Sequence, residues 1–381
     1  MTEQSNEPLV SFIVPTLNRG TYLLDTVKSV LVAGDESQVL IEVIVIDSNS
    51  DDGSWEELLK VFGNDSRLRA YQNARGSGAV PSWLEGARKI RGRFATFIWS
   101  DDGIAPFYLK RTLPLLDKGE AVAFGMHKWV HDKALNDNDF IKEIAATGHG
   151  ASQPYQPGQR HFEYCDSETV QHLSHDGVLH DYFFRNRNNP FVTITPGKAL
   201  FRADVLRCWT EEMATLMQSS WLARELLLKN AIGPDLALIL FGLEMQDAGT
   251  SFQCTEAQIN LHRVHFGQIG QNAGTWRMDA GYRIVNALFY CRGRLQSHFS
   301  DDEIYQTGAQ LALLLFASLR AIGRETNVPI AWRSALSLSK HITDIFRYCV
   351  RRDGIAGAFR LVRAAQQRRH INRLAKAEKS A

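Results

Sequence analysis

Residues 41–54 read IEVIVIDSNSDDGS, and this stretch decides the fold class. Ile41 to Ile46 is a short, mostly apolar run rich in β-branched residues, which is typical of a buried strand. An acidic loop, Asp47 to Gly53, follows directly, and Ser54 and Glu57 then have the S-x-x-E spacing of a helix capping box. The stretch therefore predicts one strand–loop–helix unit of an α/β protein.

The same alternation of strand and helix signals continues on both sides of this unit. The other expected elements are strands at Leu9–Val14, Leu68–Tyr71, Phe94–Trp99 and Ala121–Gly125, and helices at Thr21–Ala33 and from Pro81 to about Arg91. Strands separated by helices of this length indicate a Rossmann-like, mostly parallel sheet with flanking helices. Ligands of such sheets bind beyond the carboxyl ends of the strands.

The pattern changes after the fifth strand signal. His127 to Pro190 is polar and rich in His, Asn, Asp and Gln, which predicts an insertion (about 127–190) with little regular structure. From Pro196 the pattern is mainly helical, and residues 278–381 are expected to form an α-helical C-terminal region. Within that region LALLLFASL, residues 311–319, is too short to span a bilayer and predicts a buried helix or a subunit interface.

Two of the predicted strands end in acidic loops. One is Asp47 to Gly53, and the other is Ser100-Asp101-Asp102-Gly103. In a parallel sheet both loops lie at the same edge, and carboxylates gathered there suit a divalent cation that also binds substrate phosphates. The alternative is that these residues form only Asx-turns and helix caps, above all Asp51 and Asp52 beside the expected capping box.

Three motifs at these positions resemble family 2 glycosyltransferases, which have the GT-A fold. VSFIVPTLNRG (residues 10–20) resembles the opening strand and nucleotide-binding loop of the family, VIDSNSDDGS (residues 45–54) its acidic second loop, and FIWSDDG (residues 97–103) its D-x-D loop. The resemblance covers about residues 10–125 and resumes weakly around 196–267. It implies a GT-A domain over residues 1–277 and inverting transfer from a nucleotide-diphospho-sugar, with UDP favoured.

The resemblance also implies roles for particular residues. Asp47 would contact the base, Asp101 the donor ribose and Asp102 a Mn²⁺ or Mg²⁺ ion, although Trp99 stands where the family usually has the first acid of D-x-D. Arg75 would contact the uracil or diphosphate, or be only a solvated surface residue. The first loop would hold the nucleotide through Pro15, Thr16, Asn18 and Arg19.

Later positions imply the catalytic base and a second metal ligand. Family members place an acid at the start of a helix facing the acceptor, and IGPDLALIL (residues 232–240) makes Asp235 that residue, with Glu244 as the alternative. Asp235 could instead be only a helix N-terminal acid favoured by the dipole. A histidine further on is expected at the metal or diphosphate: His265, with His262 as the alternative.

Composition limits the other function classes. Net charge is +1, with 43 Lys plus Arg against 42 Asp plus Glu, so a nucleic-acid partner is not expected. Five scattered cysteines and no apolar leader indicate a cytoplasmic protein. The charge is uneven, however: residues 347–381 hold ten Lys or Arg against two acids and have apolar residues at helical spacing. This basic amphipathic tail predicts either a solvated helix or peripheral contact with an anionic membrane surface.

The expected partners are therefore a nucleotide-sugar donor, a glycan or lipid-linked glycan acceptor, the membrane surface and, through the C-terminal helices, a second copy of the chain. A non-catalytic sugar-nucleotide-binding subunit is the alternative, with the altered W-S-D-D loop in its favour. A sugar-phosphate nucleotidyltransferase is disfavoured, since PTLNR is not a glycine-rich phosphate loop. A zinc site at His172, His175 and His180 does not fit standard ligand spacing.

Overall fold

The structure is a computed structural model. It describes residues 7–74, 78–116, 119–135, 153–155, 162–175, 177–178, 181, 191, 195–219, 233–246, 251–265, 285, 343, 346–347, 349–351, 353–367 and 370. The chain divides into two compact units: residues 1–214 with 237–272, and residues 215–236 with 273–381.

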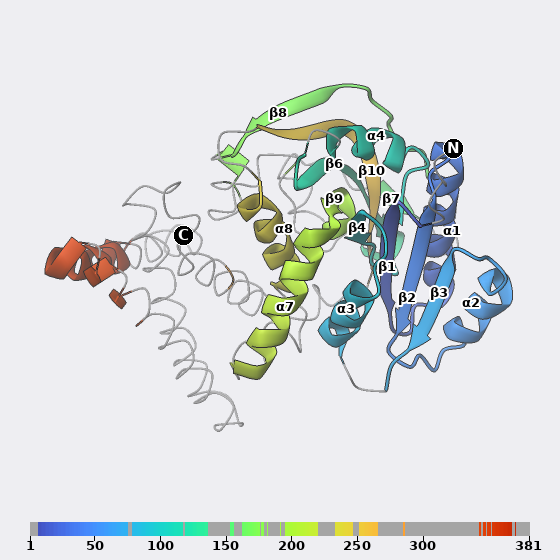
Figure 1. Ribbon diagram of the computed structural model, residues 1–381, viewed down its shortest axis with the longest axis horizontal. Helices are drawn as coiled ribbons and strands as arrows, with labels where there is room; N and C mark the ends of the chain where they lie inside the picture. Colours follow the sequence, from blue (N-terminus) through green and yellow to red (C-terminus); the bar gives the residue numbers. More distant parts are fainter. Residues whose placement is uncertain are drawn as a thin grey trace. The chain divides into compact units, whose positions relative to one another are not determined.

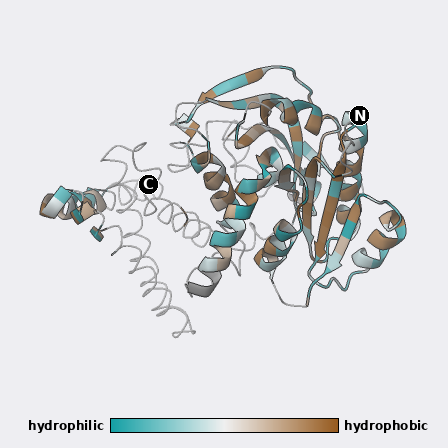
Figure 2. Ribbon diagram, in the orientation of Figure 1, coloured by the Kyte–Doolittle hydropathy of each residue, from teal (hydrophilic) through white to brown (hydrophobic). Residues whose placement is uncertain are grey.

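The first half of the central sheet is parallel, as predicted (Figure 1). Its strands lie in the order β3-β2-β1-β4, with every neighbouring pair parallel. The bounds are β1 Val10–Thr16, β2 Ile41–Asp47, β3 Leu68–Gln72 and β4 Phe94–Phe97. All residues of β1 and β2 are buried, because helices cover both faces of this part of the sheet. Figure 2 shows these strands as mainly hydrophobic.

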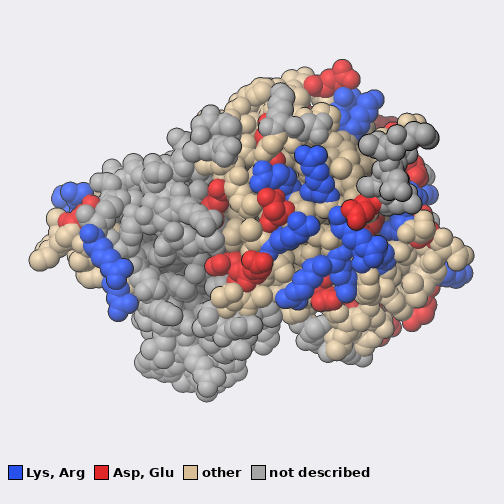
Figure 3. Space-filling view, in the orientation of Figure 1, with Lys and Arg blue, Asp and Glu red and all other residues tan. Residues whose placement is uncertain are grey.

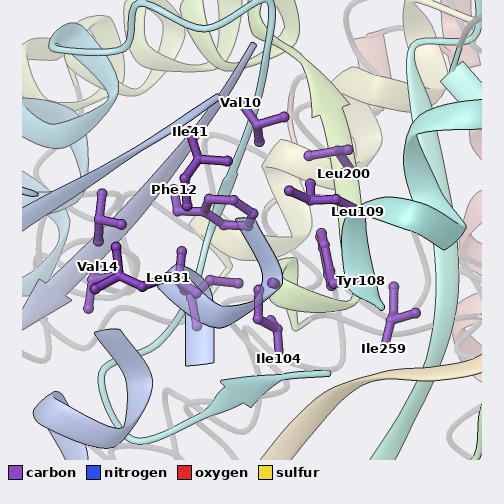
Figure 4. Packing of buried hydrophobic residues seen from close by; sticks show 14 of the residues in the cluster. Val10, Phe12, Val14, Leu31, Ile41, Ile104, Tyr108, Leu109, Leu200 and Ile259 are labelled. Atoms are coloured by element: carbon purple, nitrogen blue, oxygen red, sulfur yellow. The ribbon is translucent and has the colours of Figure 1, made fainter. Parts of the chain in front are cut away.

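Three helices connect the parallel strands of this half, and a fourth follows β4 along the chain. They are α1 Thr21–Ser37, α2 Ser54–Phe62, α3 Ala79–Arg88 and α4 Tyr108–Leu116. On one face Val10, Phe12 and Val14 pack with Leu31 of α1 and Tyr108 of α4 in a single cluster (Figure 4). On the other face α3 packs against β1 and β2. The expected α/β fold class is thus confirmed.

The second half of the sheet is mixed and was predicted less well. Strand β9 (Ala199–Arg202) is antiparallel to both β4 and β6 (Val122–Asp132), and β6 is parallel to β10 (Ser251–Val264). Strand β10 is antiparallel to β5 (Gly103–Ile104) and β8 (Val170–Ser174). Strand β7 (Gln153–Tyr155) pairs in parallel with the end of β6.

The sequence did not predict three strands of this half. Within the polar segment from His127, which was expected to have little regular structure, residues 127–132 continue β6 and residues 170–174 form β8. After Pro196, where a mainly helical pattern was expected, helices are present, but β9 and the 14-residue β10 occur as well. Polar side chains in β6 and β10 hide the apolar alternation that marks a half-buried strand.

Local helix signals were partly misplaced. The expected capping box is wrong: Gly53 is the N-cap of α2 and Ser54 already lies inside the helix. The Glu57 N–H, which a capping box would give to the Ser54 side chain, donates to the Gly53 backbone oxygen (3.1 Å), and the Ser54 N–H donates to Asp52 (3.0 Å). Helix α3 starts two residues before Pro81 and ends at Arg88 rather than Arg91.

Further helices follow β9. Helix α7 spans Ala203–Ser219 and α8 spans Pro234–Glu244. Short 3₁₀ helices cover Lys133–Leu135 and Pro196–Lys198. In the C-terminal region residues 353–367 are helical. The predicted buried helix at 311–319 lies outside the described residues. In the described part of the chain no helix is both long and apolar enough to cross a membrane.

A close approach of α3 to the sheet generates a stability prediction. A Cβ at Gly86 would lie 2.4 Å from Cγ2 of Ile13 and 3.2 Å from Cγ1 of Ile46, both buried. Gly86→Ala should lower the free energy of unfolding by about 1–3 kcal/mol, because overpacking outweighs the better helix propensity of alanine. Denaturant unfolding measures this. The control Arg88→Ala, on the exposed side of α3, should stay within about 0.5 kcal/mol; equal stability of both variants would contradict the packing.

Candidate active site

The first loop of the predicted site is tied to the second acidic loop. Asn18, which has a left-handed backbone (φ 51°), donates from Nδ2 to Asp51 (2.9 Å) and accepts from the Asp51 N–H (2.9 Å). The Gly20 N–H donates to Asp52 (2.9 Å). Asp51 and Asp52 therefore shape the loop that carries Asn18 and Arg19, as expected for loop-forming rather than metal-binding carboxylates.

Pro15 and Thr16 end β1 directly beside the end of β2. Thr16 lies opposite Asp47 in the parallel register, and both are buried. The hydroxyl of Thr16 is buried and has no hydrogen-bond partner within the described part of the chain. Buried hydroxyls without a partner are unusual in proteins.

Asp47 is held in a tight turn at the end of β2. One of its oxygens accepts hydrogen bonds from the Ser50 N–H (2.9 Å) and from Nε2 of Gln72 (2.9 Å), while the other binds the Ser50 hydroxyl. Asn49 between them has a left-handed backbone (φ 67°). The neighbouring Arg75 lies outside the described residues.

Asp101 lies where three segments meet. Its Oδ2 is 2.9 Å from Nε2 of His265, just past β10, and 3.4 Å from Nε of Arg19, in the first loop. Asp101 is only 6% exposed. The structure therefore brings together three residues that the sequence had singled out from three distant positions.

Asp102 points into the protein instead, at 1% exposure. Its Oδ2 lies 3.0 Å from Nδ1 of His262, and its Oδ1 accepts the N–H of Arg263 (3.1 Å). His265 thus contacts Asp101, whereas His262, the alternative histidine, contacts Asp102. Adjacent side chains leave a loop in different directions, so each acid contacts a different histidine.

The two carboxyl groups titrate differently. Burial raises the pKa of Asp101, but the His265 hydrogen bond and the positive charge of Arg19 outweigh it and hold this pKa below its ordinary value. Burial also raises the pKa of Asp102, and because the neighbouring negative charge of Asp101 adds to it, His262 does not fully compensate. The pKa of His262 is raised by Asp102 in spite of its burial. The site thus keeps a carboxylate at Asp101 beside a more basic carboxyl at Asp102.

Arg263 and Tyr22 also lie beside Asp101 and His265, although neither was expected there from the sequence. The buried guanidinium of Arg263 donates to the backbone oxygen of Asp101 (3.3 Å) and lies 5.3 Å from the centre of the Tyr22 ring. The Tyr22 ring in turn stacks on His265 at 5.2 Å. An arginine between two histidines in an H-R-V-H run was the available signal for these contacts.

Packing explains why Trp99 stands where the family usually has an acidic residue. Trp99, at the position of the usual first acid, stacks on Trp83 of α3 with ring centres 4.5 Å apart, and Phe97 lies 6.0 Å from it. An apolar stack therefore replaces a carboxylate at this position while Asp101 and Asp102 keep their polar partners.

Asp235 lies in the first turn of α8 and is partly buried. Its Oδ1 accepts the N–H groups of Gly233 (3.1 Å) and Leu236 (2.8 Å). Burial raises the pKa of Asp235 to about 7 although these hydrogen bonds oppose it. Such a carboxyl can exchange a proton near neutral pH. Glu244 ends the same helix.

Of the three histidines in the zinc alternative, two are described and they do not converge. His172 is exposed on β8 beside Ser251, and the buried His175 binds the backbone oxygen of Leu243. His180 lies outside the described residues. Across the described ranges no three His, Cys, Asp or Glu side chains form a metal-binding group.

Asp101 and His265 nevertheless suit a cation shared with a substrate. A carboxylate oxygen and an imidazole nitrogen 2.9 Å apart are both metal-ligand atoms. Mg²⁺ and Mn²⁺ often take only one or two protein ligands and complete their shell with substrate phosphates and water. Asp102, the metal ligand that the resemblance implies, lies deeper than Asp101, at 1% exposure against 6%, and binds His262 and the Arg263 N–H.

The family model for glycosyl transferase family 2 matches residues 11–209, just over half of the 381-residue chain. The match contains both acidic loops and the loop after β1 described above. The chain therefore belongs to glycosyl transferase family 2, and the expected family is confirmed.

Two curated relatives match about a quarter to a third of this chain. TuaG of Bacillus subtilis, named as a glycosyltransferase of teichuronic acid biosynthesis, is 35% identical over 25% of this chain and 37% of its own length. A Campylobacter jejuni enzyme named GalNAc(5)-diNAcBac-PP-undecaprenol β-1,3-glucosyltransferase is 29% identical over 31% of this chain and 38% of its own. The chain thus spans less than half the length of each of these relatives.

A solved structure extends the likeness in fold. TarS 1–349 of S. aureus, crystallised with UDP-GlcNAc, superposes with a TM-score of 0.53 at 15% identity. The match covers 95% of this chain and 91% of that one. At this identity the likeness concerns the fold alone, which agrees with the expected GT-A architecture.

The Asp102–His262 contact generates a second prediction. His262→Ala should lower the free energy of unfolding on the order of 3 kcal/mol, because it leaves a buried carboxyl without its imidazole partner. His262→Asn, whose amide can donate from a similar place, should recover part of the loss. Denaturant unfolding provides the measurement.

The exposed His172→Ala serves as the matched control and should change stability by less than about 0.5 kcal/mol. A His262→Ala protein as stable as this control would mean that His262 does not compensate Asp102.

Proposed function

We propose that the protein is an inverting glycosyltransferase that moves a sugar from a UDP-sugar to a hydroxyl of a glycan or lipid-linked glycan. The observation that carries the proposal is the meeting of Arg19, Asp101 and His265 at the carboxyl edge of the parallel strands. Ligands of such sheets bind at this edge. A cation, a carboxylate and an imidazole together suit a diphosphate and the metal that accompanies it.

Donor binding would use the ends of β1 and β2. Asp47 and the unpartnered hydroxyl of Thr16 lie side by side there, and Pro15 and Asn18 shape the loop around them. UDP is favoured as the nucleotide of the donor because of the resemblance to family 2 glycosyltransferases and because TarS was crystallised with UDP-GlcNAc. The names of TuaG and of the Campylobacter enzyme favour a cell-surface glycan or lipid-linked acceptor.

Asp101 and His265 would hold Mn²⁺ or Mg²⁺, with Asp102 behind them. When bound, such a cation supplies Lewis-acid stabilisation of the charge that develops on the leaving diphosphate. Arg19 lies beside Asp101 and adds a fixed positive charge for the same diphosphate. His262 and Arg263 keep the Asp101–Asp102 loop in place from the side of β10.

Asp235 would accept the proton of the acceptor hydroxyl. As that oxygen attacks the anomeric carbon, a new C–O bond forms on one face and the bond to the diphosphate breaks on the other, so one displacement inverts the configuration. The proton passes to the Asp235 carboxylate and UDP leaves. A carboxyl with a pKa of about 7 is a stronger base than an ordinary aspartate.

A donor screen tests the proposal. Purified protein is mixed with a panel of UDP-sugars, with Mn²⁺ or Mg²⁺ and with EDTA, and released UDP is measured. We expect UDP release with at least one sugar, loss of release in EDTA, and a loss of at least about 100-fold in Asp101→Asn, because that variant removes the carboxylate charge of the site.

The control for this screen is Asp166→Asn, which removes an exposed partner of Arg111 and should keep full activity. Release that is unchanged by EDTA and by Asp101→Asn would contradict the metal-assisted proposal. No release with any donor or cation would contradict the enzymatic one.

The pKa of Asp235 gives a pH prediction. A base must be deprotonated to act, so kcat/KM should rise about tenfold per pH unit below pH 7 and level off above it. Asp235→Asn should abolish this rise in kcat/KM with pH and lower the rate by about 100-fold or more. A flat profile between about pH 5.5 and 8.5 would rule out Asp235 as the base. Glu244→Gln, at the other end of α8, is the control that should retain the pH dependence.

A further inference from the structure

The helix over residues 353–367 exposes a stripe of large apolar side chains. Ile355 is 75% exposed, Phe359 71% and Val362 51%. The spacing i, i+4, i+7 places all three on one face of the helix. Three exposed large apolar side chains in a row need an explanation, whereas single ones do not.

The opposite face of the same helix is the buried one. Gly357 and Leu361 lie two positions after Ile355 and Phe359, about 200° around the helix, and both are buried. A Cβ at Gly357 would lie 2.4 Å from the backbone oxygen of Cys349, so this face packs closely against the preceding segment. The helix is therefore already anchored through one apolar face, and the stripe of Ile355, Phe359 and Val362 is a second one.

The charges around the stripe are mainly positive. Arg351, Arg360 and Arg363 are exposed on or beside the helix, and Figure 3 shows Lys and Arg side chains beside uncharged surface at this end of the described chain. From residue 347 onward the sequence has ten Lys or Arg and two acids, Asp353 and Glu378. Figure 2 shows hydrophobic and hydrophilic positions interleaved along the same helix.

We propose that this helix docks on an anionic lipid surface, with Ile355, Phe359 and Val362 entering the acyl boundary and the arginines contacting headgroups. An exposed apolar stripe flanked by basic residues is the arrangement of helices that lie in a membrane interface. Basic segments near anionic lipids gain further attraction that salt screens. A second copy of the chain is a poorer occupant, because pairing the stripes would bring two sets of arginines together. The proposal is independent of the sugar-transfer chemistry.

Co-sedimentation of the full chain with vesicles tests the proposal. The probes are phosphatidylcholine vesicles with and without an equal share of phosphatidylglycerol, at low and at high salt. We expect pelleting with the anionic vesicles only, weakened at high salt. The triple variant Ile355→Ser, Phe359→Ser, Val362→Ser should lose at least tenfold in affinity, and Arg360→Gln with Arg363→Gln at least threefold.

A matched control removes equally apolar surface elsewhere. Leu40, Leu59 and Val61 are 61%, 42% and 51% exposed, and changing all three to Ser should leave vesicle binding unchanged. Equal pelleting with neutral vesicles, or a stripe variant that binds like the wild type, would overturn the proposal. So would absent vesicle binding together with a dimer, seen by light scattering, that the stripe variant converts to a monomer.

Discussion

Two adjacent buried carboxyl groups, Asp101 and Asp102, impose the constraint on which this domain depends. Like charges so close to each other in a dry environment are unfavourable unless cations and hydrogen-bond donors surround them. The chain supplies Arg19 from the first loop and His262, Arg263 and His265 from β10 and the residue after it. The short β5–β10 ladder follows directly from the acidic loop, because Gly103 pairs with Leu261. Residues 160 positions apart are thereby fixed beside each other.

The same constraint positions the proposed chemistry. Both oxygens of Asp102 contact β10, through His262 and the Arg263 N–H. Asp101 lies at the carboxyl edge of the sheet, beside Arg19 and His265. The loops after β1 and β2 join there through Asn18 and Asp51. Three strand ends, one from each family motif, thus meet in one place, which is the geometry that a nucleotide diphosphate with its cation requires.

The sequence predicted the parallel half of the fold well, because Val10–Thr16 and Ile41–Asp47 are buried on both faces and are mostly apolar. It missed β10, where the polar residues Asn260, His262 and Arg263 face the protein because they hydrogen-bond to the acidic loop, Asp101 to Gly103. The histidine partners could not be assigned from spacing, since which acid faces which histidine depends on side-chain direction in a two-residue loop. Ser54 and Glu57 had the spacing of a capping box, yet Ser54 is already the first residue of α2. Its N–H donates to the side chain of Asp52, two residues before it in the acidic loop.

The central claim is that Asp101 and His265 form the edge of a site for a metal–nucleotide complex. Electron paramagnetic resonance of free Mn²⁺, titrated with protein and UDP, measures this without any need for an acceptor. We predict that UDP increases Mn²⁺ binding and that Asp101→Asn and His265→Ala each weaken it at least tenfold. The control Asp166→Asn, which changes an exposed partner of Arg111 outside the site, should leave it nearly unchanged. Mn²⁺–UDP binding that survives both Asp101→Asn and His265→Ala would contradict the account.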